Sequence, residues 1–214
     1  ELSAKFRIDD SYALVTGGAG LLGIQHTKSL LEIGAHVVIA DISEKNIAKI
    51  KNQFIGCKCS FELLDVSDEN SVNDLFKRLL KQNINIDILI NNAAIDPKVG
   101  KSISSSNNQS RLENFPLSDW NRQIDVGLKG SFLCSKIFGT HMANNLKRGV
   151  ILNIASDLAI ISPDQRLYRQ ANVDEGEQTV KPVTYSVIKS GIIGLTKYLA
   201  TYWADKNVRC NAIC

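Results

Sequence analysis

The feature that most constrains the fold of this chain is a glycine-rich loop between a short apolar run and an amphipathic helix. Residues 11–16 predict a buried strand; Gly17, Gly20 and Gly23 follow it, and a helix then runs to about Ile33. Strand, glycine loop and helix in this order form the context in which such glycines bind a dinucleotide. The glycines permit a tight turn and a close backbone approach to a pyrophosphate at the positive end of the helix dipole. An ordinary strand-to-helix turn is the alternative.

A second apolar run, residues 35–40, ends in Asp41, which lies 18 residues after Gly23. An acid near this distance hydrogen-bonds the 2′-hydroxyl of the adenosine ribose and repels a 2′-phosphate. The nearest base that follows is Lys45, so the sequence favours NAD over NADP. Asp41 could instead cap a helix, a role that Ser43 could also fill.

Apolar runs and helical patterns alternate along the rest of the chain. Strands are expected at residues 59–64, 86–90, 149–155 and 207–213, and helices at about 68–81, 116–147 and 184–205. This alternation predicts an α/β fold, a Rossmann-type doubly wound parallel sheet flanked by helices. A chain of 214 residues suits a single domain spanning 1–214.

Two segments interrupt the alternation. Residues 97–115 include a polar, serine-rich run, and residues 157–183 are rich in charge. Both follow the carboxyl ends of strands, where ligands bind in open α/β sheets. Long loops at such places are commonly functional or disordered. We expect the serine-rich run to be mobile and the second segment to contact the substrate.

Composition and charge argue against several classes of function. The formal charge of +3 is too small to indicate a nucleic acid partner. The sequence contains no apolar run of about 18 residues, so we expect no membrane span, and its first residues lack the apolar core of a signal peptide. The five cysteines show no metal-ligand spacing, so we expect no metal site and free thiols in a reducing cytoplasm.

Tyr185 and Lys189 are four residues apart on a predicted helix and therefore point to the same face. The ammonium of Lys189 would favour ionisation of the Tyr185 phenol, and such a phenol can exchange a proton with a substrate oxygen near neutral pH. The spacing alone often arises by chance on a solvated helix face. It gains weight from the glycine loop and from Ser156, which follows the fifth predicted strand.

Taken together, these motifs resemble the short-chain dehydrogenase/reductase family over essentially the whole chain. The resemblance implies hydride transfer between a nicotinamide cofactor and a carbinol or carbonyl carbon. It implies that Tyr185 is the general acid/base, that Lys189 binds the nicotinamide ribose and that Ser156 holds the reacting oxygen. The cofactor contacts that it implies are Gly17, Gly20, Leu22, Gly23, Asp41, Asp65, Val66, Asn91, Ala93, Tyr185 and Lys189.

Several of these residues have a structural alternative. Ser156 and Asp65 could cap local turns. Asn91 and Asn92 could bond backbone groups between strands, a role that coexists with cofactor contact in the family.

The chain departs from the family pattern in four places. Leu21 gives the glycine loop the spacing of the extended, sugar-nucleotide branch, whereas residues 91–94 and 153–156 look like the compact branch. Gly127 stands where compact members usually carry an asparagine that supports the catalytic lysine through a water. Ser156 and Tyr185 are 29 residues apart, more than is usual. The family would also continue beyond Cys214, so we expect a C-terminal part, including part of the substrate pocket, to be missing.

A finer resemblance concerns residues 164–169 and 181–189, which look most like the oxidoreductases of flagellin modification or surface-polysaccharide synthesis. Arg166, Arg169 and Lys181 could then bind an anionic sugar derivative as the small-molecule substrate, although a solvated charged loop is an equal alternative. A generic alcohol or ketone dehydrogenase and a non-catalytic NAD-binding regulator remain open.

We also expect a homodimer or homotetramer. The two predicted helices around residues 121–142 and 184–205 carry more apolar positions than one sheet face needs, including Ile192, Ile193, Leu195 and Leu199. Exposed apolar patches of this kind mark interfaces.

Overall fold

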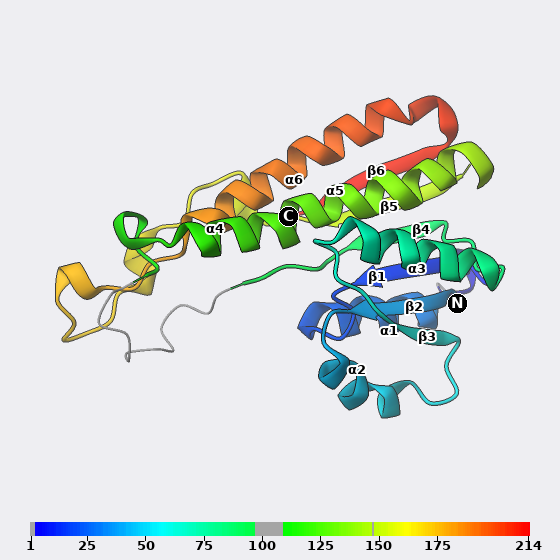
Figure 1. The fold of residues 1–214 in the computed structure, drawn as a ribbon, viewed down its shortest axis with the longest axis horizontal. Helices are drawn as coiled ribbons and strands as arrows, with labels where there is room; N and C mark the ends of the chain where they lie inside the picture. Colours follow the sequence, from blue (N-terminus) through cyan, green and yellow to red (C-terminus); the bar gives the residue numbers. More distant parts are fainter. Residues whose placement is uncertain (1–2, 97–108, 147) are drawn as a thin grey trace.

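The structure, a computed structural model, describes residues 3–96, 109–146 and 148–214. Within these ranges six parallel strands form one sheet in the order β3-β2-β1-β4-β5-β6 (Figure 1). The strands are β1 (Tyr12–Thr16), β2 (His36–Asp41), β3 (Cys59–Leu63), β4 (Ile88–Asn91), β5 (Gly149–Ile154) and β6 (Val208–Ile213). The strand order reverses direction between β1 and β4, so the predicted doubly wound sheet is confirmed.

The central strand β1 shows why the sheet is buried on both faces. Leu14 lies opposite Val38 of β2 and Leu89 of β4, and all three pack toward one helical layer. Ala13 and Val15 point to the other side and join a second apolar cluster. A parallel strand covered on both faces reads as a continuous apolar run, which is how residues 12–16 read in the sequence.

Helices cover the two faces of the sheet. On one side lie α1 (Leu21–Glu32) and α2 (Glu44–Ile50), the latter continued by a 3-10 turn over Lys51–Phe54. On the other side lie α3 (Glu69–Lys81), a long helical segment over residues 117–146, and α6 (Val183–Tyr202) (Figure 1). Trp203 and Leu199, at the end of α6, complete the larger apolar cluster.

The long helical segment alternates between α-helical and π-helical turns. It consists of α4 (Leu117–Ile124), a π-helical turn at Asp125–Lys129, α5 (Gly130–Cys134), and further π-helical turns at Ser135–Gly139 and Met142–Leu146. The sequence predicts its extent within one residue at each end. Pro116 precedes the first turn, and no side chain caps it.

The segment between β5 and α6 is more regular than its composition suggests. Residues 157–183 contain three 3-10 turns. The buried Gln178 follows the third turn, and its amide donates to the carbonyls of Gln170 (3.0 Å) and Val173 (2.6 Å), which lie between the second and third turns. The described end of the other insertion, residues 109–115, bonds to this segment: Val180 N–H donates to Ser110 Oγ (3.1 Å). The serine-rich run expected to be mobile lies mostly outside the described residues.

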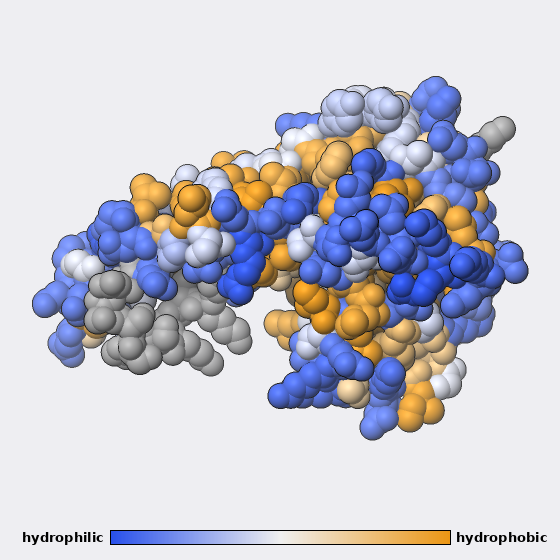
Figure 2. Space-filling view, in the orientation of Figure 1, coloured by the Kyte–Doolittle hydropathy of each residue, from blue (hydrophilic) through white to orange (hydrophobic). Residues whose placement is uncertain are grey.

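In Figure 1 the amino-terminal ends of α4 and α6 project beyond the sheet together with residues 157–183. Figure 2 shows that the surface is hollowed between this projection and the rest of the molecule. The carboxyl ends of the strands point toward this side (Figure 1), so the topology places the predicted site residues here.

The described ranges contain neither a membrane-spanning helix nor a candidate metal site. No helix there is long and apolar enough to cross a bilayer, and no group of His, Cys, Asp or Glu side chains there is arranged to hold a metal ion. All five cysteines lie within those ranges and are free thiols.

Candidate functional site

The glycine loop joins β1 to α1 and is packed too closely for side chains. Gly17 has φ +60°, and a Cβ at this position would lie 2.9 Å from the Cα of Ala93. A Cβ at Gly23 would overlap the carbonyl oxygen of Gly17. Gly18, which the motif analysis did not single out, is required as well, because its Cβ would lie 2.7 Å from Ile39 Cγ2. The loop is therefore held against β2, β4 and the start of α1 by backbone packing.

Two polar side chains fix this loop to the end of β4. Thr16 Oγ1 accepts from the backbone N–H groups of Asn92 (3.0 Å) and Ala93 (3.1 Å). The amide of Asn92 donates to the carbonyls of Thr16 (3.0 Å) and Gly17 (3.1 Å). Asn92 thus has the backbone-bonding role that the sequence left open, and it belongs to the architecture of the loop.

Asp41 is the last residue of β2 and is only 8% exposed. Its carboxylate accepts from the N–H of Ala19 in the glycine loop (3.1 Å) and from the N–H of Ser43 (2.9 Å). Ser43, rather than Asp41, caps α2 by accepting from Asn46 N–H (3.2 Å). Asp41 therefore couples the loop to the strand that would carry the adenosine ribose.

Asp65 and Val66 follow β3. Asp65 Oδ1 accepts from the N–H (2.9 Å) and the hydroxyl (2.6 Å) of Ser67, whereas Asp68 caps α3. The side chain of Val66 is buried against Gly130, where a Cβ would lie 2.7 Å from Val66 Cγ2. The side chain of Val66 thus belongs to the core, and Asp65 organises the turn before α3.

Asn91 lies in a buried polar network that joins β4 to β5 and to two neighbouring helical segments. Its amide donates to Asn153 Oδ1 of β5 (2.8 Å) and to Ser135 Oγ (3.0 Å), and the Asn153 amide donates to Thr196 Oγ1 of α6 (2.8 Å). The Oδ1 atom of Asn91 is buried and has no hydrogen-bond partner among the described residues. The network ties the last residue of β4 to β5 and to α6, which carries Tyr185.

The structure brings Tyr185 and Lys189 together on α6, near the carboxyl end of β5. Lys189 is buried, and its Nζ donates to the carbonyl of Ile154 at 2.6 Å. The same Nζ lies 5.8 Å from the centroid of the Tyr185 ring. Burial lowers the pKa of the Lys189 ammonium, since desolvation disfavours its charged form.

Ser156 follows β5 directly and makes the local contacts that the sequence offered as an alternative. Its hydroxyl donates to Asp157 Oδ1 (2.8 Å) and accepts from Leu158 N–H (3.2 Å), which caps the 3-10 turn Asp157–Ala159. Ser190 Oγ donates to the carbonyl of Ala159 (3.0 Å) and fastens this turn to α6. Ser156 is therefore two residues from the carbonyl that holds Lys189, on a turn that is fixed to the helix of Tyr185.

A second lysine lies at Tyr185, and the motif analysis did not place it there. Lys181 Nζ is 3.9 Å from the centroid of the Tyr185 ring, closer than Lys189, and 2.7 Å from Asp96 Oδ1. Their positions, four residues before Tyr185 and five after Asn91, match no motif. The topology of the two insertions brings them to this place.

Close packing between two helices also explains why residue 127 is a glycine, apart from the effect on the catalytic lysine that the sequence suggested. A Cβ at this position would lie 2.7 Å from Cγ2 of Ile188, the residue before Lys189. On the facing helix, a Cβ at Gly191 would lie 3.0 Å from Leu128. The long helical segment and α6 approach each other closely here, and an asparagine at residue 127 would collide with this packing.

Arg166 and Arg169 pair with acids of their own segment. Arg166 Nη2 is 2.7 Å from Asp164 Oδ2, and Arg169 Nη2 is 2.8 Å from Glu175 Oε1. The Arg166 guanidinium lowers the pKa of the Asp164 carboxyl through their hydrogen bonds. Both arginines are exposed and could be reached by a ligand only in competition with these carboxylates.

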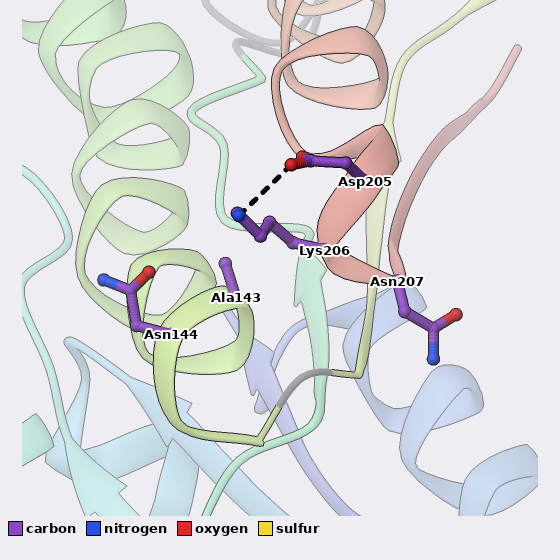
Figure 3. A pocket seen from close by; sticks show the side chains of 5 residues that line it. All are labelled: Ala143, Asn144, Asp205, Lys206 and Asn207. Atoms are coloured by element: carbon purple, nitrogen blue, oxygen red, sulfur yellow. Dashed lines mark ion pairs between the residues drawn. The ribbon is translucent and has the colours of Figure 1, made fainter.

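A separate hollow lies at the opposite edge of the sheet (Figure 3). It has a volume of about 420 Å³ and is lined by Ala143, Asn144, Asp205, Lys206 and Asn207, near the start of β6. Asp205 and Lys206 form an ion pair of 3.1 Å beside it. None of the predicted site residues lines this hollow, so the chemistry is to be sought at the carboxyl ends of the strands.

The residues at the carboxyl ends of the strands fit a nicotinamide dinucleotide. Gly17 and Gly23 leave a loop whose backbone can approach a pyrophosphate. The exposed Leu21 and Leu22 lie at the start of α1, and Asp41 stands at the end of β2. Tyr185 and Lys189 lie beyond β4 and β5.

Comparisons with known proteins agree with this geometry. A family model described as enoyl-(acyl carrier protein) reductase matches residues 19–214. Galactitol 2-dehydrogenase of Rhizobium johnstonii is 31% identical over 212 residues, which cover 98% of this chain and 72% of that protein. Short chain dehydrogenase/reductase dpfgG of Gibberella zeae is 32% identical over 208 residues, which cover 94% of this chain and 66% of that protein. The crystal structure of a gluconate 5-dehydrogenase from Burkholderia cenocepacia, in complex with NADP and tartrate, matches with a TM-score of 0.80 and 25% identity, covering 99% of this chain and 73% of that one.

Proposed function

The chain belongs to the short-chain dehydrogenase/reductase family, and on that premise we propose that it is an NAD-dependent oxidoreductase acting on a sugar, a polyol or a related sugar derivative. The reaction is hydride transfer to or from a carbinol or carbonyl carbon. The observation that carries this proposal is the position of Lys189, which is bonded to the Ile154 carbonyl and faces the Tyr185 ring. This contact supports the assignment of Tyr185 and Lys189 as the proton-transfer pair, because the Ile154 carbonyl lies at the carboxyl end of β5, two residues before Ser156.

Each residue of the site has a defined task in the proposed reaction. In the direction of reduction, the Tyr185 phenol donates its proton to the carbonyl oxygen of the substrate, and in the direction of oxidation the phenolate accepts a proton from the hydroxyl. Ser156 orients the reacting oxygen by donating its hydroxyl hydrogen, which requires release of its present bond to Asp157. Lys189 supplies positive charge beside the phenol. The dinucleotide, when bound, supplies or accepts the hydride.

NAD is the proposed cofactor because Asp41 places a carboxylate at the end of β2. A carboxylate there hydrogen-bonds a ribose hydroxyl and repels a 2′-phosphate. The gluconate 5-dehydrogenase structure reported above holds NADP, so members similar to this chain differ in the choice. The buried position of Asp41 and its two backbone hydrogen bonds support a fixed orientation of the carboxylate.

The substrate class is proposed from the relatives and from the charge of the second insertion. Galactitol and gluconate, named for two of the similar proteins, are a polyol and a sugar acid. Arg166 and Arg169 are proposed contacts for an anionic group, reached by exchange with Asp164 and Glu175. A narrower role in surface-glycan or flagellin-glycan synthesis rests on residues 164–169 and 181–189 alone. The free thiols support a reducing compartment such as the cytoplasm as the place of action.

A homodimer or homotetramer is proposed, on different residues from those that the sequence suggested. Ile192 and Leu199 are buried in the apolar core of the chain and are not free to form an interface, which corrects that expectation. The exposed apolar side chains on the same helices are instead Phe132, Val187, Tyr198 and Tyr202. Light scattering of the full-length protein tests the proposal, and a monomer would contradict it.

The function is tested by following the absorbance of reduced nicotinamide with sugars, polyols, sugar acids, sugar phosphates and nucleotide sugars, with NAD and NADP in parallel. The proposal expects turnover of at least one of these classes with NAD. Tyr185→Phe is the control, because it should bind NAD and fail to turn over. Cofactor binding without turnover of any substrate would favour the alternative of a non-catalytic NAD-binding regulator.

A further inference from the structure

The Tyr185 ring carries a second cation that the family motif does not include. Lys181 Nζ lies 3.9 Å from the ring centroid, whereas Lys189 Nζ lies at 5.8 Å. A cation within about 6 Å of an aromatic centroid is attracted to the face of the ring. Of the two lysines, Lys181 is therefore in the stronger position to act on the orientation of the ring.

Lys181 is held in this place from both ends. Its side chain is 11% exposed and its Nζ is paired with Asp96 Oδ1 at 2.7 Å. Its backbone N–H donates to Gln165 Oε1 (2.9 Å), and the amide of Gln165 donates to its carbonyl (3.3 Å). The Asp96 side chain is 56% exposed, so the fixed backbone and the burial of Lys181, rather than burial of the whole ion pair, hold the ammonium in place. Lys181 belongs to the segment 157–183, and Asp96 directly precedes the segment 97–115. The two residues are far apart in the sequence, and their ion pair lies at the Tyr185 ring.

The charged groups around Tyr185 form one electrostatic unit. Lys189 lies on its own helix, Lys181 on the segment before that helix and Asp96 on the segment after β4; Asp157, on the turn after β5, bonds to Ser156. Two of these groups act on Lys189: the charge of Asp96 raises the pKa of Lys189 and the charge of Lys181 lowers it, both after the larger effect of burial.

We infer that Lys181 is a positioning residue for Tyr185, and that its pairing with Asp96 sets the orientation of the phenol. The inference rests on the proposed function only where it assigns proton transfer to Tyr185. The ammonium of Lys181 lies on the ring face and limits its rotation, and Asp96 holds the ammonium there. The insertion that carries Lys181 is thereby coupled to the proton-transfer step.

The first test needs neither substrate nor cofactor. The protein is labelled with tyrosine carrying ¹³C at Cζ, the Tyr185 signal is assigned by its loss in Tyr185→Phe, and the chemical shift and width of the signal are compared at one neutral pH. Lys181→Met should move the signal, and Asp96→Asn should move it as well, because Lys181 loses the carboxylate that holds its ammonium. Lys181→Arg keeps the cation and should restore most of the signal. Lys136→Met is the matched control, because Lys136 pairs with Glu69 at 2.9 Å on the exposed surface and should leave the signal unchanged.

A displaced signal in Lys181→Met that Lys181→Arg restores supports the inference, because rescue by a second cation separates the contact with the ring from a general packing defect. An unmoved signal in Lys181→Met, or a signal that Lys181→Arg does not restore, would overturn it. If Lys181→Met does not fold, the Asp96→Asn signal decides alone.

The second test uses turnover. Near neutral pH, Lys181→Met should lower kcat by up to about tenfold with little change in the KM for NAD, since a misplaced reacting group costs turnover. Unchanged kcat together with the displaced signal would sink the proton-transfer role of Tyr185 and leave the positioning by Lys181 standing. An active enzyme in which the Tyr185 signal does not move would sink this inference and leave the proposed function standing.

Discussion

The two halves of the site are built in different ways. In the nucleotide half, residues 16–93, the glycine loop is packed too closely for side chains, with Gly17 on Ala93 and Gly23 on the carbonyl of Gly17, and polar side chains at the strand ends bond to its backbone. In the reaction half, residues 156–189, the side chains around Tyr185 are positioned by polar contacts, such as Lys189 with the Ile154 carbonyl and Lys181 with Asp96. In the first half the backbone itself is fixed against the sheet, and in the second half the reacting side chains are held by contacts with irregular segments.

This difference separates the consequences of substitution. A change in the nucleotide half should alter cofactor binding, because the loop has no space into which to relax. A change in the reaction half should mainly alter turnover while the sheet stays in place, with Lys189 the exception because it is also proposed to bind the nicotinamide ribose. The buried chain from Asn91 through Asn153 to Thr196 joins the halves, so it is the place where the separation should fail.

The largest effect that the comparison predicts is on turnover. Tyr185→Phe removes one hydroxyl from a half-buried ring on α6 and leaves the glycine loop untouched. We expect kcat to fall by about two to four powers of ten, the usual contribution of a general acid/base, with the Kd for NAD nearly unchanged. Steady-state kinetics and a cofactor fluorescence titration measure the two quantities.

Its matched variants sharpen the result. Ser156→Ala should lower kcat through lost orientation of the reacting oxygen, whereas Lys189→Ala should impair both turnover and cofactor binding. A Tyr185→Phe protein that turns over at the rate of the unaltered chain would disprove the mechanism.

The same division explains how far sequence reasoning reached. The glycine loop, the alternation of strands and helices and the four-residue spacing of Tyr185 and Lys189 are local patterns on regular elements, and the structure has the sheet and the helices where the sequence expects them. Lys181 and Asp96 come from irregular segments, and only tertiary contact brings them to one ring. Likewise Ile192 and Leu199 read as surplus apolar positions, because the sequence does not show that the long helical segment packs on α6 closely enough to bury them.

The second prediction concerns Gly127→Asn, which would restore the asparagine that compact members of the family usually carry at this position. The Cβ would lie 2.7 Å from Ile188, so we expect this variant to lower the free energy of unfolding by about 1–3 kcal/mol, as overpacking does, and to reduce turnover by displacing α6. Urea denaturation measures the stability. Gly194→Ala is the control on α6, because a Cβ there meets no atom within 4 Å. It should be neutral or stabilising by up to about 1 kcal/mol, and a destabilised control would contradict this packing argument.

The third prediction concerns cofactor choice. Asp41→Ala should narrow the preference for NAD over NADP, because the repulsion of a 2′-phosphate is lost. It should also cost about 1–3 kcal/mol of stability, since the N–H groups of Ala19 and Ser43 lose their acceptor. Asp41→Asn also removes the charge but keeps an acceptor for one of the two N–H groups, because Ala19 and Ser43 bond to different carboxylate oxygens; it should narrow the cofactor preference and retain only part of the stability. Equal Kd values for NAD and NADP in the unaltered protein would refute the proposed specificity.

The smallest effect is expected at the edge of the reaction half. Arg166 is exposed and pairs with Asp164 two residues away, so Arg166→Ala should leave the urea midpoint and the kcat for a neutral polyol unchanged, because exposed ion pairs contribute little. If the guanidinium binds an anionic group, the KM for a sugar acid or sugar phosphate should rise several-fold at constant kcat, the signature of lost uniform binding. Lys206→Ala, which removes an exposed cation paired with its neighbour Asp205 at the opposite edge of the sheet, should change neither KM. If Arg166→Ala and the unaltered protein have the same KM for the anionic substrate, Arg166 does not contact that substrate. The reaction half would then consist of Ser156, Tyr185 and the two lysines.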